Sequence, residues 1–90
     1  MNVKRVEKKI WDVEGFYVRI LHLDNRDVRG DREDLPSYPY KRASMDEKTV
    51  ADWKEERFKP NYPGFNVEVV KGNREVAHGG IKLGNIRDSY

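Results

Sequence analysis

Hydrophobic and polar positions along the chain change period from one segment to the next, and one segment has a complete helix pattern. At about 100° per residue, its apolar positions gather on one face: Val50, Ala51, Trp53 and Phe58. Thr49 and Asp52 have the spacing of an N-cap with a capping box. Pro60 disfavours helical backbone at the residue before it. The sequence therefore predicts one principal helix over about 50–59.

Segments before and after this helix have the two-residue period of strands. Residues 16–24 alternate and are rich in β-branched and aromatic types. Residues 3–13 are also predicted as a strand, joined to residues 16–24 through a tight turn. Residues 65–70 and 74–78 flank Gly-Asn and predict a second hairpin, with Val69 opposite Val76. A further short strand is expected at 81–83.

These elements predict a single α+β domain over residues 1–90. Its antiparallel sheet would have four to five strands, in two hairpins, packed against the principal helix. Trp53 and Phe58 would face the sheet, because this buries the apolar surfaces of both elements. The polar segment 25–37 would be a connecting loop.

Composition narrows the class of protein. The chain has no cysteine, which excludes disulfides and thiolate chemistry. Charged residues make up 38%, but the net charge is only +2, as expected for a mixed, solvated surface. No apolar run approaches the ~20 residues of a membrane helix, and the first residues lack the apolar stretch of a signal peptide. We expect a soluble cytoplasmic protein without a membrane partner.

Candidate catalytic chemistry is sparse. No serine or threonine lies in the context of an activated nucleophile. His22 and Asp24 share a strand face, and His78 could join them at a metal, but histidines hydrogen-bonded at strand ends are the simpler interpretation. We predict no catalytic, metal or cofactor-binding residue and no cofactor. The expected role is a non-enzymatic interaction or ligand-binding module.

Basic residues interleaved with aromatic ones form a candidate nucleic-acid or partner surface. Its predicted members are Arg5, Lys8, Tyr38, Tyr40, Lys41 and Arg42. Stacking rings with nearby cations are how sheets hold single strands. Against this, the neighbouring segment 24–34 is acidic and would repel phosphate. The alternative is a Tyr-Pro loop that packs its rings on the rim of the core. Nucleic-acid binding is therefore the second functional hypothesis.

The second face of residues 16–24 is too apolar for a solvated surface. Tyr17, Leu21 and Leu23 lie on it and are the candidate self-association face, which predicts a homodimer. The alternative is that residues 25–43 and the C-terminal segment cover this face. A self-interface at Tyr17 and Leu21 would favour the interaction module, and a contiguous basic face would favour nucleic acid. A cleft converging on a histidine and a carboxylate would favour an enzyme.

Three stretches within residues 37–88 carry a resemblance: TVADWKEERF, YPGFNVEVVKGN and GG-IKLGNIR. In them the chain resembles a loose group of small bacterial proteins. Such proteins are uncharacterised and are carried on phages and integron gene cassettes. The resemblance implies a bacterial, cytoplasmic origin on a mobile element, and it implies no activity.

Overall fold

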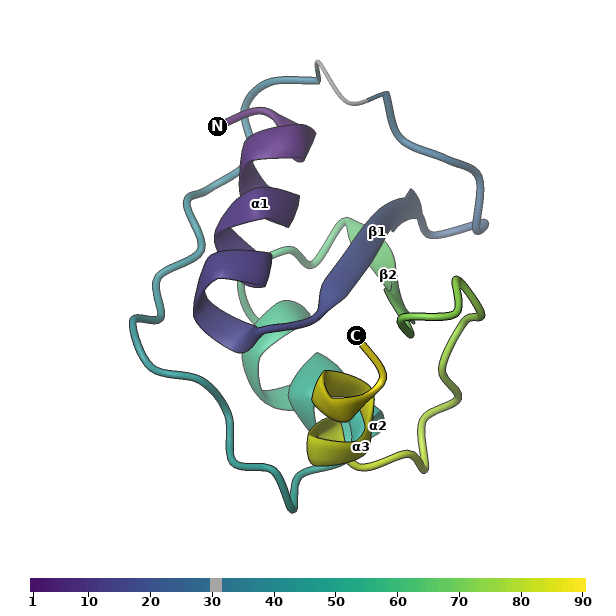
Figure 1. Cartoon of the computed structure of the whole chain (residues 1–90). Coiled ribbons are helices and arrows are strands. Elements are labelled where there is room, and N and C mark those ends of the chain that lie inside the picture. Colours follow the sequence, from purple (N-terminus) through teal and green to yellow (C-terminus); the bar gives the residue numbers. More distant parts are fainter. Residues whose placement is uncertain (30–31) are drawn as a thin grey trace.

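A computed structural model describes residues 1–29 and 32–90 (Figure 1). Gly30 and Asp31, within the predicted loop 25–37, lie outside the described residues. The described part is an α+β fold with three α-helices, one π-helical segment and a two-stranded antiparallel sheet. The predicted sheet of four to five strands is therefore wrong. In chain order the elements are α1 (Val3–Glu14), β1 (Tyr17–His22), α2 (Val50–Trp53), η1 (Lys54–Phe58), β2 (Phe65–Val70) and α3 (Leu83–Asp88).

The largest correction concerns residues 3–13, which form α1 and not a strand. Val3, Val6 and Ile10 recur at helical spacing and are all buried. Most of the intervening residues are lysine, arginine and glutamate, which are good helix formers. Asn2 caps the helix by accepting from the Arg5 amide at 2.8 Å. Gly15 ends it at φ 78°, in the left-handed conformation that glycine adopts without strain.

The two strands that do pair are distant in sequence. β1 and β2 run antiparallel, with Val18 opposite Val69 and Ile20 opposite Val67. All four side chains are buried. The first predicted hairpin is absent because its first segment is helical.

The second predicted hairpin is only partly formed. The 71–74 turn is present, but residues 74–78 make a single bridge, between Val70 and Val76, in place of a strand. Ala77 is the buried residue of this segment, while Val76 is 51% exposed. The predicted pairing of Val69 with Val76 is off by one residue. In place of the strand expected at 81–83, Lys82 makes a single bridge to Thr49 and α3 begins at Leu83.

The principal helix begins at its predicted cap. Thr49 and Asp52 form the capping box, with both reciprocal hydrogen bonds present. After Trp53 the helix widens into η1, where the Lys59 amide donates to the Lys54 carbonyl, five residues back, at 2.8 Å. Trp53 and Phe58 are fully buried, and Trp53 meets Phe16 edge to face at 5.1 Å. Trp53 and Phe58 share one core with the buried residues of β1 and β2, although that sheet has two strands and not the predicted four to five.

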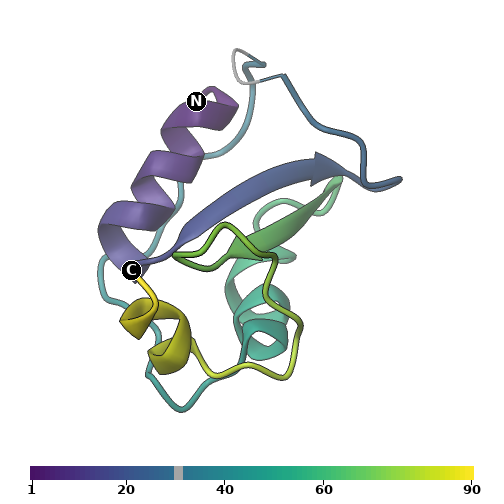
Figure 2. The same ribbon diagram turned by 45° about the vertical axis from the view of Figure 1, so that its right-hand side comes forward.

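Two strands can form the whole sheet because helix and loop groups hydrogen-bond to backbone groups on its outer edges. The short sheet lies between α1 on one side and α2 with α3 on the other (Figure 2). On the outer edge of β1, the Ile20 amide donates to the Glu7 carboxylate at 2.8 Å, and the His22 amide donates to the Arg26 carbonyl at 2.8 Å. On the outer edge of β2, the Val69 carbonyl accepts from Ala77 at 2.8 Å. Helix and loop groups therefore replace the missing strands.

Candidate functional site

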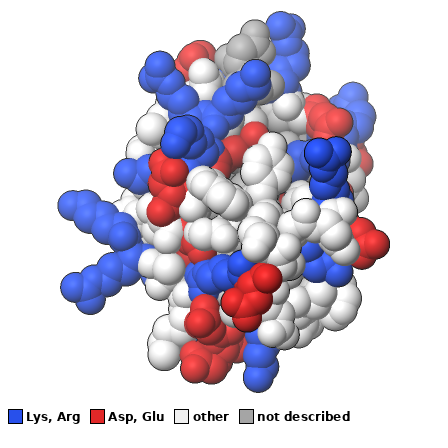
Figure 3. Space-filling model, in the orientation of Figure 1, with Lys and Arg blue, Asp and Glu red and all other residues white. Residues whose placement is uncertain are grey.

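A groove of about 700 Å³ lies at the end of the sheet where β1 begins and β2 ends. The elements that line it are α1, the first residue of β1, the turn after β2 and the last residue of the chain. We call it the basic aromatic groove, and its lining residues are Lys4, Glu7, Lys8, Trp11, Tyr17, Val70, Lys71, Gly72, Arg74 and Tyr90. Figure 3 shows lysine and arginine side chains gathered over α1, above an uncharged area at the centre of the same face.

Three aromatic side chains line this groove and remain accessible. Trp11 is 41% exposed, Tyr17 47% and Tyr90 48%. The rings of Trp11 and Tyr90 meet edge to face at 5.0 Å between centroids. Partly exposed rings with fixed neighbours offer surfaces on which a planar ligand can stack.

Tyr90 is held in place by the end of the sheet. Its hydroxyl accepts from the Tyr17 amide at 2.8 Å and donates to the Val70 carbonyl, so it bridges these two paired residues. Burial raises the pKa of Tyr90, so the hydroxyl stays protonated and able to donate at neutral pH. The groove wall at this end is thereby fixed to both strands.

Four cations surround the aromatic residues. Lys8 pairs with Asp12 at 3.2 Å and Lys71 with Glu75 at 3.4 Å. Both are surface pairs, which contribute little and exchange readily for a stronger anion. Among the described residues, Lys4 and Arg74 form no ion pair. The groove therefore offers positive charge that Glu7, Asp12 and Glu75 balance only in part.

Local sequence explains how these groups meet. Lys4, Lys8 and Trp11 recur at helical spacing on one stripe of α1, beside its buried face. On the opposite side, the turn after β2 lies against the C-terminal segment, and the Gly72 amide donates to the Ser89 hydroxyl at 2.8 Å. A Cβ atom at position 72 would lie 1.8 Å from the Ser89 carbonyl oxygen. Glycine is required there by this close approach of two backbones.

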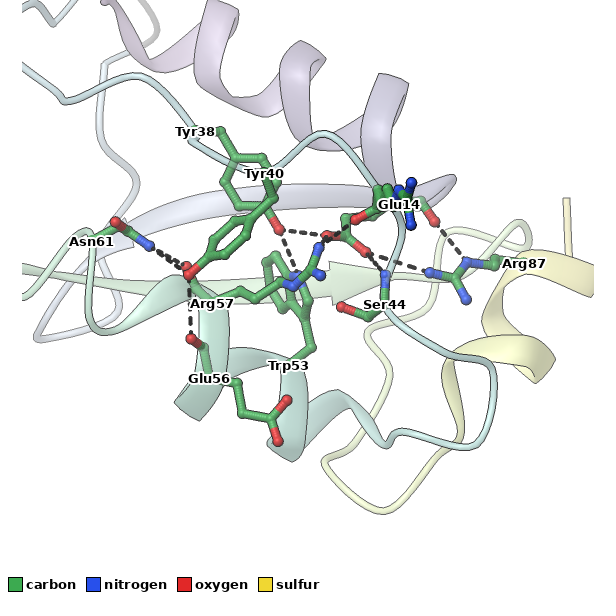
Figure 4. Close-up of polar contacts among 10 residues, drawn as sticks. Glu14, Tyr38, Tyr40, Ser44, Trp53, Glu56, Arg57, Asn61 and Arg87 are labelled. Carbon is green, nitrogen blue, oxygen red and sulfur yellow. Dashed lines mark hydrogen bonds and ion pairs between the residues drawn. The ribbon is translucent and has the colours of Figure 1, made fainter.

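A second polar cluster surrounds Glu14, the last residue of α1 (Figure 4). This carboxylate is 1% exposed. Its Oε2 accepts from the Tyr38 hydroxyl at 2.6 Å and from Arg57 Nη1 at 2.7 Å. Its Oε1 accepts from the Ser44 amide at 2.8 Å and from Arg87 Nη2 at 3.4 Å. We call these five residues the Glu14 cluster.

The Glu14 cluster ties four parts of the chain together and is closed to ligands. The Tyr38 hydroxyl also accepts from Trp53 Nε1 at 3.0 Å, and burial with the neighbouring carboxylate raises the Tyr38 pKa above its ordinary range. Each carboxylate oxygen already has two donors, which is its full capacity. We interpret the cluster as a structural anchor, because no acceptor is left for a substrate.

The predicted nucleic-acid surface has its members in different surroundings. Lys8 lies in the basic aromatic groove, while Arg5 is exposed on α1 but does not line the groove. Tyr38 is 2% exposed, and Tyr40 is half-buried with the Arg57 guanidinium 4.3 Å from its ring centre. The structure packs both rings against the protein, so neither is offered to a base.

The remaining predicted surface residues are also separated. Lys41 and Arg42 are exposed on the loop before α2. Of the candidate self-association face, Tyr17 lies in the groove, Leu21 is 2% exposed and Leu23 is 67% exposed. The segment after β1 reaches back over Leu21 through a bridge at Asp27. These three residues therefore do not make one apolar face.

Among the residues that the structure describes, neither histidine meets a carboxylate in a cleft. His22 stacks on Phe65 at 6.4 Å, and the His78 ring accepts from the Gly80 amide at 3.2 Å. Across residues 1–29 and 32–90, no three histidine, aspartate or glutamate side chains are grouped as metal ligands.

Comparison with protein-family models, curated proteins and solved structures finds no match to this chain. The resemblance to proteins of mobile elements, the bacterial origin and the cytoplasmic location stay predictions. Within the described part of the chain, no helix has the length and apolar character needed to cross a membrane.

Sequence reasoning did not find most of the groove. Lys4 and Trp11 were assigned to a strand, where Trp11 falls on the opposite face from Lys4 and Lys8. Arg74 and Tyr90 carry no local motif, and their position depends on the C-terminal segment folding back onto β2. The available signal was the helical recurrence of Val3, Val6 and Ile10, which orients the rest of α1.

Proposed function

We propose that this protein is a non-enzymatic binding module and that single-stranded nucleic acid occupies its basic aromatic groove. One observation carries the proposal: three accessible rings lie among four cations in a single groove. Single strands are held by this combination, because bases stack on aromatic rings and phosphates are attracted to lysine and arginine.

The arrangement supports single strands over duplexes. Trp11, Tyr17 and Tyr90 present rings within a recess, and an unpaired base can enter it while a paired base cannot. Lys4 on α1 and Arg74 in the turn after β2 come from the two elements that border the recess. A base between them would place its flanking phosphates near these cations.

The test is fluorescence anisotropy of a labelled mixed-sequence DNA strand, its RNA counterpart and the duplex, at about 50 and 200 mM salt. We expect the single strands to bind more tightly than the duplex, with affinity falling steeply as salt rises. No binding of any strand at the lower salt would contradict the proposal, because electrostatic attraction is strongest there.

Intrinsic fluorescence locates the binding site in the same titration. The chain has two tryptophans, of which Trp11 lies in the groove and Trp53 is fully buried. Stacking of a base on Trp11 should quench its emission. We expect Trp11→Phe to abolish the quenching while the far-UV spectrum is unchanged. Quenching that survives this substitution would place the strand elsewhere.

Self-association is the second candidate function. The observation that favours it is the same set of exposed rings, since Trp11, Tyr17 and Tyr90 could be covered by a second copy of the chain. Sedimentation velocity at rising protein concentration separates the two. A homodimer that dissociates on adding DNA would show that the copies and the strand compete for one groove.

A further inference from the structure

One residue of the basic aromatic groove does not suit phosphate. Among the described residues that line it, Glu7 alone has an acidic side chain. A negative charge beside four cations weakens their attraction for phosphate, so its presence suggests contact with a different part of the ligand.

Glu7 is fixed in position and only partly satisfied. Its Oε2 accepts from the Ile20 amide on β1 at 2.8 Å, which ties the carboxylate to the strand edge. Its Oε1 makes no hydrogen bond within the described part of the chain. A carboxylate oxygen accepts up to two hydrogen bonds, so Oε1 is open and Oε2 has one remaining position.

The chemistry of the bases indicates which one suits this carboxylate. Guanine carries two adjacent donors on its pairing edge, the ring N1–H and the amino group at C2. These match the two oxygens of a carboxylate. Adenine and cytosine offer one amino group beside a ring nitrogen that accepts. Thymine and uracil offer one N–H between two carbonyl oxygens, and these oxygens are repelled by a carboxylate.

We infer that Glu7 reads the pairing edge of a guanine that stacks in the groove, which makes it the specificity-determining residue for a guanine-containing single strand. The inference rests on the proposed function of the groove. Trp11 supplies the stacking surface about one helical turn away, and Lys4 lies one turn before Glu7 on the same helix. Rings and cations then provide affinity, and the carboxylate provides the choice of base.

The alternative role for Glu7 is structural, as the cap on the outer edge of β1. The two roles predict different behaviour for Glu7→Gln. A glutamine oxygen still accepts from the Ile20 amide, so a structural role is preserved. The second oxygen becomes an amide NH₂ group that opposes the donors of guanine, so a recognition role is lost.

The experiment uses four labelled oligothymidine strands that differ only at one central base, which is G, A, C or T. We expect the wild-type protein to prefer the G strand by about tenfold, the discrimination typical of one bidentate contact to a base. Glu7→Gln should bind all four strands within about twofold of one another. The matched control is Glu47→Gln, because Glu47 is exposed and does not line the groove, and it should keep the preference for G.

Acidification provides a second measurement that needs no variant. Burial raises the pKa of Glu7, and Asp27 acts in the same direction, while the Ile20 amide, Arg19 and Lys4 act against it. Protonation removes the charge that attracts the guanine donors, whereas lysine and phosphate keep theirs. The preference for G over T should therefore fall as the pH falls towards the pKa of Glu7, while binding of the T strand is retained.

The outcomes separate this inference from the function on which it rests. Equal binding of all four strands by the wild-type protein, or a G preference that survives both Glu7→Gln and acidification, would overturn the role of Glu7 and leave the groove as a general single-strand site. If the wild-type protein bound none of the four strands, both the role of Glu7 and the proposed function of the groove would be overturned.

Discussion

Two carboxylates of α1 have opposite surroundings. Glu14 is fully buried and receives four hydrogen bonds from protein groups. Glu7, two helical turns earlier, lines an open groove and receives one. A buried charge is tolerated only when its partners are complete, so Glu14 belongs to the fold. An incompletely paired charge among exposed rings is available to a ligand.

Tryptophans follow the same division. Trp53 is buried beside the Glu14 cluster and donates a hydrogen bond to Tyr38. Trp11 is exposed in the groove, and its ring meets that of Tyr90 edge to face. Chemically similar residues thus contribute to the core at one site and, in the function proposed above, to recognition at the other. Substitutions at matched pairs can test whether this division is real.

The largest effect is expected at Glu14. Glu14→Ala removes the acceptor for Tyr38, the Ser44 amide and two arginines, and the free energy of unfolding should fall by about 3–5 kcal/mol. Equilibrium urea denaturation measures this change. Glu47→Ala, at an exposed glutamate, should stay within about 0.5 kcal/mol of wild type. A Glu14 variant as stable as this control would mean that the cluster is not an anchor.

The tryptophan pair should separate stability from binding. Trp53→Ala should lower the free energy of unfolding by about 3–5 kcal/mol, because it empties a fully buried site. Trp11→Ala should lower the free energy of unfolding by only about 1 kcal/mol, through loss of the edge contact with Tyr90. The same variant should weaken single-strand binding by about 1–3 kcal/mol. Denaturation and anisotropy on the same two variants give both numbers. Equal effects on binding would remove the distinction between the two sites.

The same division explains what could be predicted from the sequence. The capped helix at Thr49 and the burial of Trp53 follow from local chemistry and were found. The strand prediction for residues 3–13 was wrong. Val3, Val6, Ile10 and Val13 recur at helical spacing and face the core, whereas Trp11 lies off that face. In the structure Trp11 is exposed, and its apolar character reflects the groove and not the core. An exposed apolar residue therefore obscured the helical pattern of this segment.

Sheet size and groove composition depend on contacts between distant residues. The Ile20 amide is satisfied from α1, and the Tyr17 amide by the hydroxyl of Tyr90. No local pattern shows that a side chain will take the place of a neighbouring strand. For the same reason, Tyr38 looked like a stacking residue in sequence, because nothing near it indicates a buried partner as far away as Glu14.

The smallest expected effect concerns two neighbouring cations on α1. Lys4 lines the groove, whereas Arg5, the next residue, is exposed outside it. Lys4→Ala should remove one phosphate contact and reduce the slope of log affinity against log salt by about 0.7. Arg5→Ala removes the same charge from the same helix and should leave the slope nearly unchanged. Anisotropy titrations at four salt concentrations measure both slopes.

This last pair is the most discriminating because the two variants have the same net charge. A general attraction of the strand to a positive protein would respond equally to either loss, since it depends on the overall field and not on position. Equal reductions in slope would therefore mean that the strand does not occupy a defined groove. A reduction confined to Lys4→Ala would place a phosphate beside the stripe of α1 that also carries Glu7 and Trp11.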